Sequence, residues 1–358
     1  MTEEMSWARV IESVERNQHL TKAQARWSMH EIMSGRATDS QMSAFLLGLR
    51  AKGEVLDELS GFVDVMLEHA VKVPVTDQAI DIVGTGGDQL GTVNISSMAA
   101  IVIAACGYPV LKHGSRSASG KTGSSEMLES LGIKLDLTPE QLAEVFQKTK
   151  ITFFFAPLFH PSLKHVGPTR KALGVPTTFN FLGPLANPVQ PIATALGVAN
   201  RDIAPLIANE IKARNRSAIV FRGSDGLDEL TITGPSHVWL VHKNSMTELD
   251  FDPKSLGIAL GSVKDLLGGD AKDNAEVARD LFAGNLGDRP AIKDIVALNA
   301  AVGMAAMELA KSADLESFNF QNVLEQKFAL ANNSISSGEA QSKMLEWVEA
   351  TQQYQSLP

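Results

Sequence analysis

The chain has 358 residues, about two and a half times the length of a typical domain, so we expect two domains. Its composition, 44% hydrophobic and 20% charged, excludes a disordered or fibrous protein. The formal net charge of −9 argues against a nucleic-acid-binding surface as the main function, so any phosphate site must be built locally.

The cysteine content and the apolar runs limit the cellular setting. Cys106 is the only cysteine, which excludes an internal disulfide or a zinc site of several cysteines and favours a reducing, cytoplasmic location. The acidic start has no apolar segment, so we expect no secretory signal. The most apolar run, residues 98–106, is too short to span a bilayer, so we expect no membrane partner.

The amino-terminal part of the chain carries only helical periodicity. Apolar side chains recur at helical spacing in residues 42–49 and 56–67, with Gly35 and Gly53 as helix ends. Residues 73–75, Val-Pro-Val, follow the last of these helices and form a stiff connection to the next part of the chain. We therefore predict an all-helical domain over residues 1–75, joined by part of residues 160–190.

From residue 79 the pattern changes to short β-branched runs alternating with helices. Runs at 80–83 and 109–112 enclose an apolar helical stretch at 95–106, the pattern of a βαβ unit and hence of a parallel sheet. The fold class is therefore α/β: residues 76–358 form a large domain with a mostly parallel central sheet flanked by helices. We expect further strands at 151–155, 194–198, 218–221 and 238–241, and helices from 139, over 203–213 and from 290.

A glycine-rich loop, Gly84–Asp88, follows the first predicted strand and leads into the apolar helix. Glycines let main-chain N–H groups approach a phosphate, and the start of a helix favours an anion by roughly 0.3–1 kcal/mol. The alternative to a phosphate site is an ordinary glycine-rich turn with polar caps. A dinucleotide fingerprint is disfavoured, because it needs glycine where the chain has Gln89.

A second loop, residues 112–125, follows the next strand and gathers Lys112, Arg116 and Lys121 among six Ser and Thr hydroxyls. It is not a P-loop, because five residues separate Gly114 from Gly120 where that motif allows four. Both loops leave the carboxyl ends of parallel strands, where such sheets bind ligands. This favours a di- or triphosphate-sized ligand over an ordinary solvated basic loop.

Two further segments carry candidate chemistry. Asp228 and Glu229 form an acidic turn after a strand and can supply oxygen ligands to Mg²⁺, although such turns are often only solvated. His160 and His165 are five residues apart, which disfavours a helical zinc pair. Arg170 could clamp a carboxylate, but spacing alone favours a surface salt bridge.

Together these segments resemble the anthranilate phosphoribosyltransferase family of tryptophan biosynthesis. They follow in order along essentially the whole chain: Gly84–Asp88, Asn94–Ser97, residues 112–124, His160–His165, Asn180–Pro188 and Asp225–Glu229. The resemblance implies a homodimer with two Mg²⁺ ions per monomer. It also implies transfer of the phosphoribosyl group of phosphoribosyl pyrophosphate to the amine of anthranilate.

The resemblance assigns roles residue by residue, without a general acid or base. Magnesium would be bound by Ser96, Asp228 and Glu229. Anthranilate would be bound by Gly84, Ser115, His160 and Arg170, with Arg170 on the carboxylate. Phosphoribosyl pyrophosphate would be bound by Gly84, Gly87, Asp88, Thr92, Asn94, Ile95, Ser96, Ser97, Lys112, His113, Gly114, Arg116, Ser119, Gly120 and Ser124.

One residue departs from the family pattern: Ser115 stands where the family usually has asparagine. Serine has a shorter reach and no second donor, so we expect weaker anthranilate binding. Two alternatives stay open. A pyrimidine nucleoside phosphorylase would leave Arg170 and the Asp228-Glu229 pair without a purpose. A nucleic-acid-binding relative would need a basic face that the net charge disfavours.

Overall fold

The computed structural model describes residues 5–116 and 122–355, and in it the chain divides into two compact units. The first, called here the helical unit, comprises Met1–Lys72 and Ala156–Pro188. The second, the α/β unit, comprises Val73–Phe155 and Val189–Pro358. The helical unit is therefore made of two stretches of chain separated by the first part of the sheet.

Short polar caps and apolar faces build the helical unit. Thr21 and Thr38 each accept a hydrogen bond from the main chain of a glutamine three residues on, which begins a helix. Phe45 packs edge-on between the rings of Trp7 and Phe62 in the core. The elements are α1 (Trp7–Glu15), α2 (Lys22–Met33), α3 (Asp39–Lys52), α4 (Leu56–Glu68), α8 (Ala156–Phe159), η1 (Pro161–His165), α9 (Gly167–Leu173), α10 (Phe179–Leu182) and η2 (Gly183–Leu185).

A seven-stranded sheet forms the centre of the α/β unit, with the order β3-β2-β1-β4-β5-β6-β7. The first five strands of this order are parallel, and β6 and β7 join as an antiparallel hairpin beside β5. The prediction of a mostly parallel sheet is confirmed. The strands are β1 (Ile80–Gly84), β2 (Val110–Gly114), β3 (Ile151–Phe155), β4 (Ala193–Gly197), β5 (Ser217–Gly223), β6 (Ser236–His242) and β7 (Ser245–Phe251).

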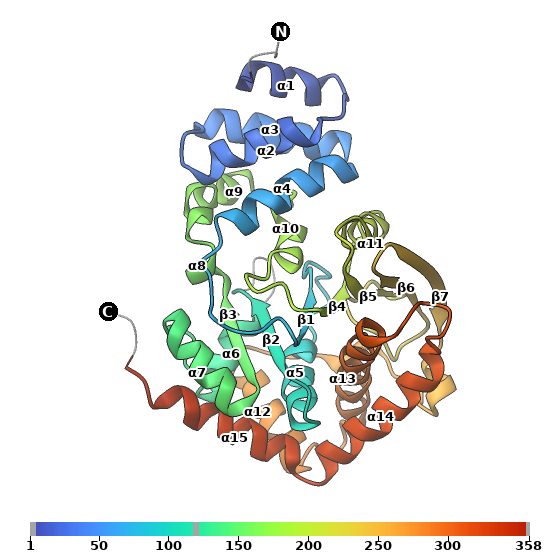
Figure 1. Ribbon diagram of the computed structural model, residues 1–358. Helices are drawn as coiled ribbons and strands as arrows, with labels where there is room; N and C mark the ends of the chain where they lie inside the picture. The colour runs from blue at the N-terminus through green and yellow to red at the C-terminus, as the bar shows by residue number, and fades with distance from the viewer. Residues whose placement is uncertain (1–4, 117–121, 356–358) are drawn as a thin grey trace. The chain divides into compact units, whose positions relative to one another are not determined.

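Helices flank this sheet, and α5 and α13 lie side by side against it (Figure 1). Every residue of α5 from Ser97 to Ala104 is buried, as its nearly continuous apolar sequence requires. A Cβ on Gly303 of α13 would lie 2.4 Å from the Ile103 side chain, so the two helices approach closely. The helices are α5 (Ile95–Ala105), α6 (Ser124–Leu131), α7 (Pro139–Thr149), α11 (Ala204–Ala213), α12 (Ala271–Ala283), α13 (Pro290–Lys311), α14 (Phe320–Ser336) and α15 (Glu339–Gln352), with the short turns η3 (Pro253–Leu256) and η4 (Val263–Leu266).

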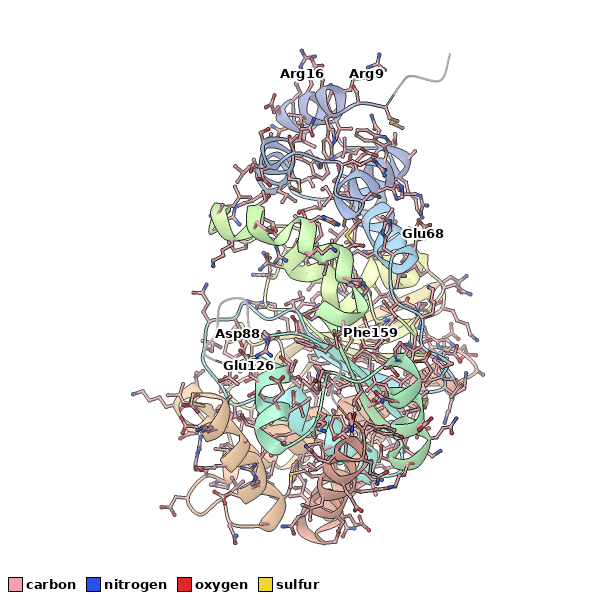
Figure 2. All side chains as sticks on the ribbon, turned by 90° about the vertical axis from the view of Figure 1, so that its left-hand side faces the viewer. Arg9, Arg16, Glu68, Asp88, Glu126 and Phe159 are labelled. Carbon is pink, nitrogen blue, oxygen red and sulfur yellow. The ribbon has the colours of Figure 1, made fainter. Side chains whose placement is uncertain are left out.

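Parallel strands bring their carboxyl ends to one edge of the sheet, and this positions the candidate site. The loops that follow β1, β2 and β5 therefore leave from the same edge, which we call the carboxyl edge. Asp88, on the loop after β1, lies at the same end of the α/β unit as Glu126 at the start of α6 (Figure 2). Within the described residues, each helix is too short or too polar to cross a membrane.

Candidate active site

Four strands end in glycine at the carboxyl edge: Gly84 of β1, Gly114 of β2, Gly197 of β4 and Gly223 of β5. We call these residues the glycine rim. A Cβ at Gly84 would lie 2.1 Å from Oδ2 of Asp228, and one at Gly197 would lie 1.7 Å from its main-chain oxygen. The rim is glycine because neighbouring loops cross directly over the strand ends, where no side chain fits.

The acidic turn, residues 224–231, is folded by its own polar side chains. Asp225 Oδ2 accepts hydrogen bonds from the hydroxyls of Thr231 and Thr233, both at 2.6 Å, and its Oδ1 accepts from the Leu227 N–H at 3.1 Å. The amide of the buried Asn299, in α13, pairs with both main-chain groups of Leu230 at 3.0 and 2.9 Å. The backbone on either side of Asp228 and Glu229 is therefore held in place.

Main-chain donors of two other segments bind the two carboxylates of this turn. The Gly86 N–H, in the loop after β1, donates to Oδ2 of Asp228 at 2.6 Å. The Ser96 N–H, at the start of α5, donates to Oε1 of Glu229 at 3.0 Å. The acidic turn and the first glycine-rich loop thus lie together, as the sequence predicts for loops that leave one edge.

The electrostatics of these carboxylates favour a bound cation. Burial, followed by the charge of Asp88, raises the pKa of Asp228 to about 7. Burial and then Asp228 raise the pKa of Glu229 well above its ordinary value, while Lys112 opposes the shift. The cluster carries more negative charge than its surroundings neutralise. Such a cluster is stabilised by a cation and by positively polarised ligands.

Lys112 lies beneath the first loop rather than on the surface. Its side chain is 2% exposed, and Nζ donates to the Ile82 carbonyl at 2.5 Å and to Oγ of Ser96 at 3.2 Å. Burial lowers the pKa of this ammonium group, and Asp81, Glu229 and Asp228 act in the opposite direction. Lys112, Ser96 and Glu229 are therefore connected, and they belong to one site.

Two described residues at the end of β2 and in the loop after it, His113 and Arg116, have partners outside this cluster. Side chains alternate along a strand, so the side chain of the buried His113 points to the opposite face from Lys112. The main-chain N–H of His113 donates to Oδ1 of Asp81 at 3.2 Å. The Arg116 guanidinium pairs with Glu129 at 3.3 Å and lies over the Phe155 ring. The predicted site residues Ser119 and Gly120, with Lys121, lie outside the described residues.

The remaining predicted residues of this loop lie close to the strand end. The Ser124 hydroxyl donates to the carbonyl of the exposed Ser115 at 3.3 Å. A Cβ at Gly114 would lie 2.5 Å from the same Ser124 hydroxyl. The start of α6 is therefore packed tightly against the end of β2.

A segment that sequence reasoning missed, residues 266–270, pairs with the stretch that precedes α5. The Val93 N–H donates to the Leu266 carbonyl at 3.0 Å, and the Gly268 N–H donates to the Gly91 carbonyl at 2.9 Å. The predicted ligand Thr92 bridges Leu267 in the same ladder. Segment 266–270 therefore fixes the backbone that carries Thr92 and Asn94.

The predicted acceptor residues His160 and Arg170 belong to the helical unit. His160 is buried, its Nε2 lies 2.8 Å from the Ala186 carbonyl, and burial lowers its pKa to about 4, so the ring is neutral at pH 7. The half-buried Arg170 lies over the Phe179 ring and donates to Oδ1 of Asn180 at 3.4 Å. Asn180 also accepts from the Thr177 N–H at 2.9 Å, so it orients the guanidinium.

The residues that hold this site in place give weak sequence signals. Gly197 and Asn299 are single residues in otherwise ordinary strand and helix patterns. A glycine at a strand end after a run of β-branched and small residues is a signal that a loop crosses there. A lone asparagine in the apolar helix α13 is a signal that it satisfies buried main-chain groups.

The donor set fits Mg²⁺ when a substrate completes it. Among the described residues, no group of three or more His, Cys, Asp and Glu side chains forms a complete metal site. Asp228 and Glu229 offer two carboxylates with raised pKa values, and Mg²⁺ typically takes one or two carboxylates together with substrate phosphates.

Comparisons with known proteins cover nearly the whole chain. Residues 8–70 match the helical bundle domain of a glycosyl transferase family, and residues 76–341 match the α/β domain of that family. An anthranilate phosphoribosyltransferase of Leifsonia xyli subsp. xyli is 50% identical over 351 residues, which are 98% of this chain and 100% of the relative.

Solved structures agree with the same fold. The crystal structure of anthranilate phosphoribosyltransferase from Thermus thermophilus has 32% sequence identity and a TM-score of 0.85, covering 96% of this chain and 99% of that one. The Saccharomyces cerevisiae enzyme in complex with PRPP and Mg has 24% identity and the same TM-score of 0.85, covering 98% and 99%.

Proposed function

The chain belongs to the anthranilate phosphoribosyltransferase family of glycosyl transferases, and we propose that its carboxyl edge binds the donor substrate together with Mg²⁺. The reaction transfers the phosphoribosyl group of phosphoribosyl pyrophosphate to the amine of anthranilate. It yields N-(5-phosphoribosyl)anthranilate and pyrophosphate, a step of tryptophan biosynthesis. The names of the relatives support this function over the pyrimidine nucleoside phosphorylase alternative.

Main-chain N–H groups of the first loop bind the phosphates of the donor, apart from the Gly86 N–H, which donates to Asp228. Gly86 and Gly87 are exposed, both have positive φ, and a Cβ at either would meet open space, so substrate can approach their backbone. Six residues further on, the start of α5 presents the Ser97 N–H, since the N–H groups of Ile95 and Ser96 donate to Val93 and Glu229. Neutral hydroxyls of Thr92, Ser96 and Ser124 complete the proposed phosphate site.

Asp228, Glu229 and Ser96 hold Mg²⁺ between the protein and the pyrophosphate. The raised pKa values of the two carboxylates support this role, because a cation relieves the repulsion that causes part of each shift. Two ions per monomer stay a prediction, made from the family resemblance. Mg²⁺ neutralises charge on the departing pyrophosphate.

Positioning and leaving-group stabilisation are sufficient for the reaction. An enzyme of modest power removes about 8 kcal/mol of barrier, and correct orientation alone can contribute about 7–11 kcal/mol. Lys112 contributes by fixing Ser96 and Glu229 beneath the phosphates. An arylamine is neutral at pH 7, so the nucleophile needs no strong general base.

Arg170 receives the carboxylate of anthranilate. Its guanidinium is half-buried and oriented by Asn180, so it is arranged to bind a planar anion with two parallel hydrogen bonds. Roles for Gly84, His160 and Ser115 toward anthranilate stay predictions, and so does the homodimer.

Replacing Ser115 with asparagine is expected to lower the KM for anthranilate about two- to tenfold. The longer side chain adds one neutral hydrogen bond of about 0.5–1.5 kcal/mol to the acceptor. Steady-state kinetics at saturating phosphoribosyl pyrophosphate measures the change, with Ser130→Asn, near the carboxyl end of α6, as a control. An unchanged or higher KM would show that position 115 does not face the acceptor.

The proposed function is tested by mixing the protein with anthranilate, phosphoribosyl pyrophosphate and Mg²⁺. We expect anthranilate fluorescence to fall with time, with one pyrophosphate released per anthranilate consumed. Consumption should stop when a chelator removes the metal. If anthranilate is not consumed at any Mg²⁺ concentration, the proposed function is wrong.

A further inference from the structure

A closed ring of four hydrogen bonds connects the proposed phosphate site to the start of α12. The Gly269 N–H donates to Oδ1 of Asn274 at 2.8 Å, and Nδ2 of Asn274 donates to Oδ1 of Asn94 at 2.8 Å. Nδ2 of Asn94 donates to the Thr122 carbonyl at 3.4 Å, and the Thr122 hydroxyl donates to the Gly269 carbonyl at 3.1 Å. The ring joins the stretch before α5, the end of the second loop and segment 266–270.

Main-chain groups determine which atom donates and which accepts in each hydrogen bond of this ring. A main-chain N–H can only donate, and a main-chain carbonyl can only accept. Gly269 presents an N–H, so the side-chain atom of Asn274 that faces it must be oxygen. The Asn274 nitrogen then faces Asn94, whose facing atom must be oxygen in turn. The Asn94 nitrogen is left to face the Thr122 carbonyl, which can only accept. Neither amide can flip without placing two donors or two acceptors together.

Asn94 occupies the N-cap position of α5, yet its side chain does not cap that helix. Asparagine at an N-cap normally accepts from the N–H two or three residues on, here Ser96 or Ser97. In the described chain the Asn94 side chain makes no such bond, and the Ser96 N–H donates to Glu229 instead. Asn274 therefore holds the Asn94 oxygen away from the helix start.

The contact is built into the fold around it. Asn274 is 2% exposed, and it is the fourth residue of α12. A Cβ at Gly268 would lie 2.4 Å from Oδ1 of Asn274 and 3.0 Å from the Val93 nitrogen, so Gly268 permits the close approach of segment 266–270. An asparagine that served only to begin α12 would not require this packing, because Asp270 already caps that helix.

We propose that Asn274 is a positioning residue that orients the Asn94 amide for binding of the donor phosphates. By holding Oδ1 of Asn94, it keeps this acceptor from competing for the Ser97 N–H, since the N–H groups of Ile95 and Ser96 already donate to Val93 and Glu229. It also turns the amide nitrogen, with its second N–H, toward the phosphate loops. This inference rests on the proposed function, since it concerns the same phosphoribosyl pyrophosphate site.

Asn274→Asp is the direct test. An aspartate still accepts from Gly269, but its charge repels Oδ1 of Asn94. The Asn94 amide therefore turns its nitrogen to the carboxylate and its oxygen toward the phosphates, and its hydrogen bond to the Thr122 carbonyl is lost. We expect the KM for phosphoribosyl pyrophosphate to rise at least about tenfold, the effect of losing a hydrogen bond to a charged group. The KM for anthranilate should change less than about twofold. Asn322→Asp, whose hydrogen-bond partners Asn319 and Gln326 lie just before and within α14, controls for the added charge.

A double-mutant cycle separates orientation from long-range charge. In an Asn94→Ala background, Asn274→Asp should not raise the KM for phosphoribosyl pyrophosphate further, because no amide is left to reverse. An undiminished effect in that background, or an unchanged KM in the single variant of an active enzyme, overturns the inference. An inactive wild-type protein would instead contradict the proposed function.

Asn274→Ala keeps the inference testable if the aspartate variant does not fold. Alanine is favourable inside a helix. Without the hydrogen bond from Asn274, the Asn94 side chain is free to cap α5 and competes there with the phosphates. We expect a KM for phosphoribosyl pyrophosphate raised about three- to tenfold with little change in Tm, and no further rise in the Asn94→Ala background. A lower Tm with an unchanged KM would show a purely structural role.

Discussion

Asp228→Asn is expected to lower kcat at least about a hundredfold and to raise the Tm of the metal-free protein. The substitution removes a carboxylate that holds Mg²⁺, whose neutralisation of the leaving group contributes several kcal/mol to catalysis. It also removes a buried negative charge beside Asp88 and Glu229, which repel it when no cation is present. Turnover assays and thermal unfolding with a chelator measure the two effects.

The stability gain should depend on pH in a defined direction. The pKa of Asp228 is about 7 in the folded chain against 3.8 for an ordinary aspartate, so the folded state binds more protons between these values. Stability from this carboxyl is therefore present below about pH 4 and lost as pH rises through about 7. The Tm difference between variant and wild type should be small at pH 4 and largest above pH 7.

The exposed Asp202 provides the control for this prediction, because Asp202→Asn removes the same charge outside the site. It should leave both kcat and the pH dependence unchanged. A variant at Asp228 that kept normal turnover with the same Mg²⁺ requirement would show that the acidic turn does not hold the metal.

Gly197→Ala is expected to reduce kcat/KM about a hundredfold. A methyl group 1.7 Å from the Asp228 main-chain oxygen cannot be accommodated by a side-chain rotation, so the acidic turn must move away from β4. A displacement of about 1 Å in a catalytic group can cost this much. The Mg²⁺ concentration for half-maximal activity should rise, because both carboxylates move with the turn.

Gly261→Ala is the matched glycine control in the same unit. A Cβ there would make only ordinary contacts, at 3.5 Å and beyond, and its effect on activity should be small. If Gly197→Ala folds and keeps wild-type kcat/KM and Mg²⁺ dependence, then the glycine rim does not position the acidic turn.

The sequence predicts those strands and helices whose hydrophobic pattern or helix-start residues are clear. The predicted strand at 151–155 agrees with β3, and the prediction that Pro290 opens a long helix is confirmed by α13. Strand β7 was missed because its residues are mostly exposed and polar, so pairing with β6 rather than burial makes it a strand.

The candidate site was predictable where residue type and topology act together. Lys112 and the carboxylates of the acidic turn follow from loops at one edge of a parallel sheet, and the structure brings them together. Arg116 and His113 follow the same logic, yet Arg116 pairs with Glu129 and the His113 side chain faces away from Lys112. The position of a residue in the sequence does not determine which neighbour its long side chain contacts.

The supporting residues could not be predicted, because their partners are distant in the chain. Asn274 lies 180 positions from Asn94, and Asn299 lies 69 positions from Leu230. An asparagine hydrogen-bonds equally well to a local turn or to a remote amide, so its identity alone does not indicate the partner. The sequence alone likewise does not distinguish Gly197 from an ordinary small strand residue, because its close contact with the acidic turn forms only in the folded chain.

The proposed function requires one site that binds phosphoribosyl pyrophosphate through Mg²⁺, and isothermal titration calorimetry tests this most directly. Wild-type protein is titrated with phosphoribosyl pyrophosphate in the presence of Mg²⁺, and again with a chelator. We predict saturable binding at one equivalent per chain with Mg²⁺ and a loss of at least about tenfold in affinity without it. Equal affinity under the two conditions, or no binding in either, would contradict the account.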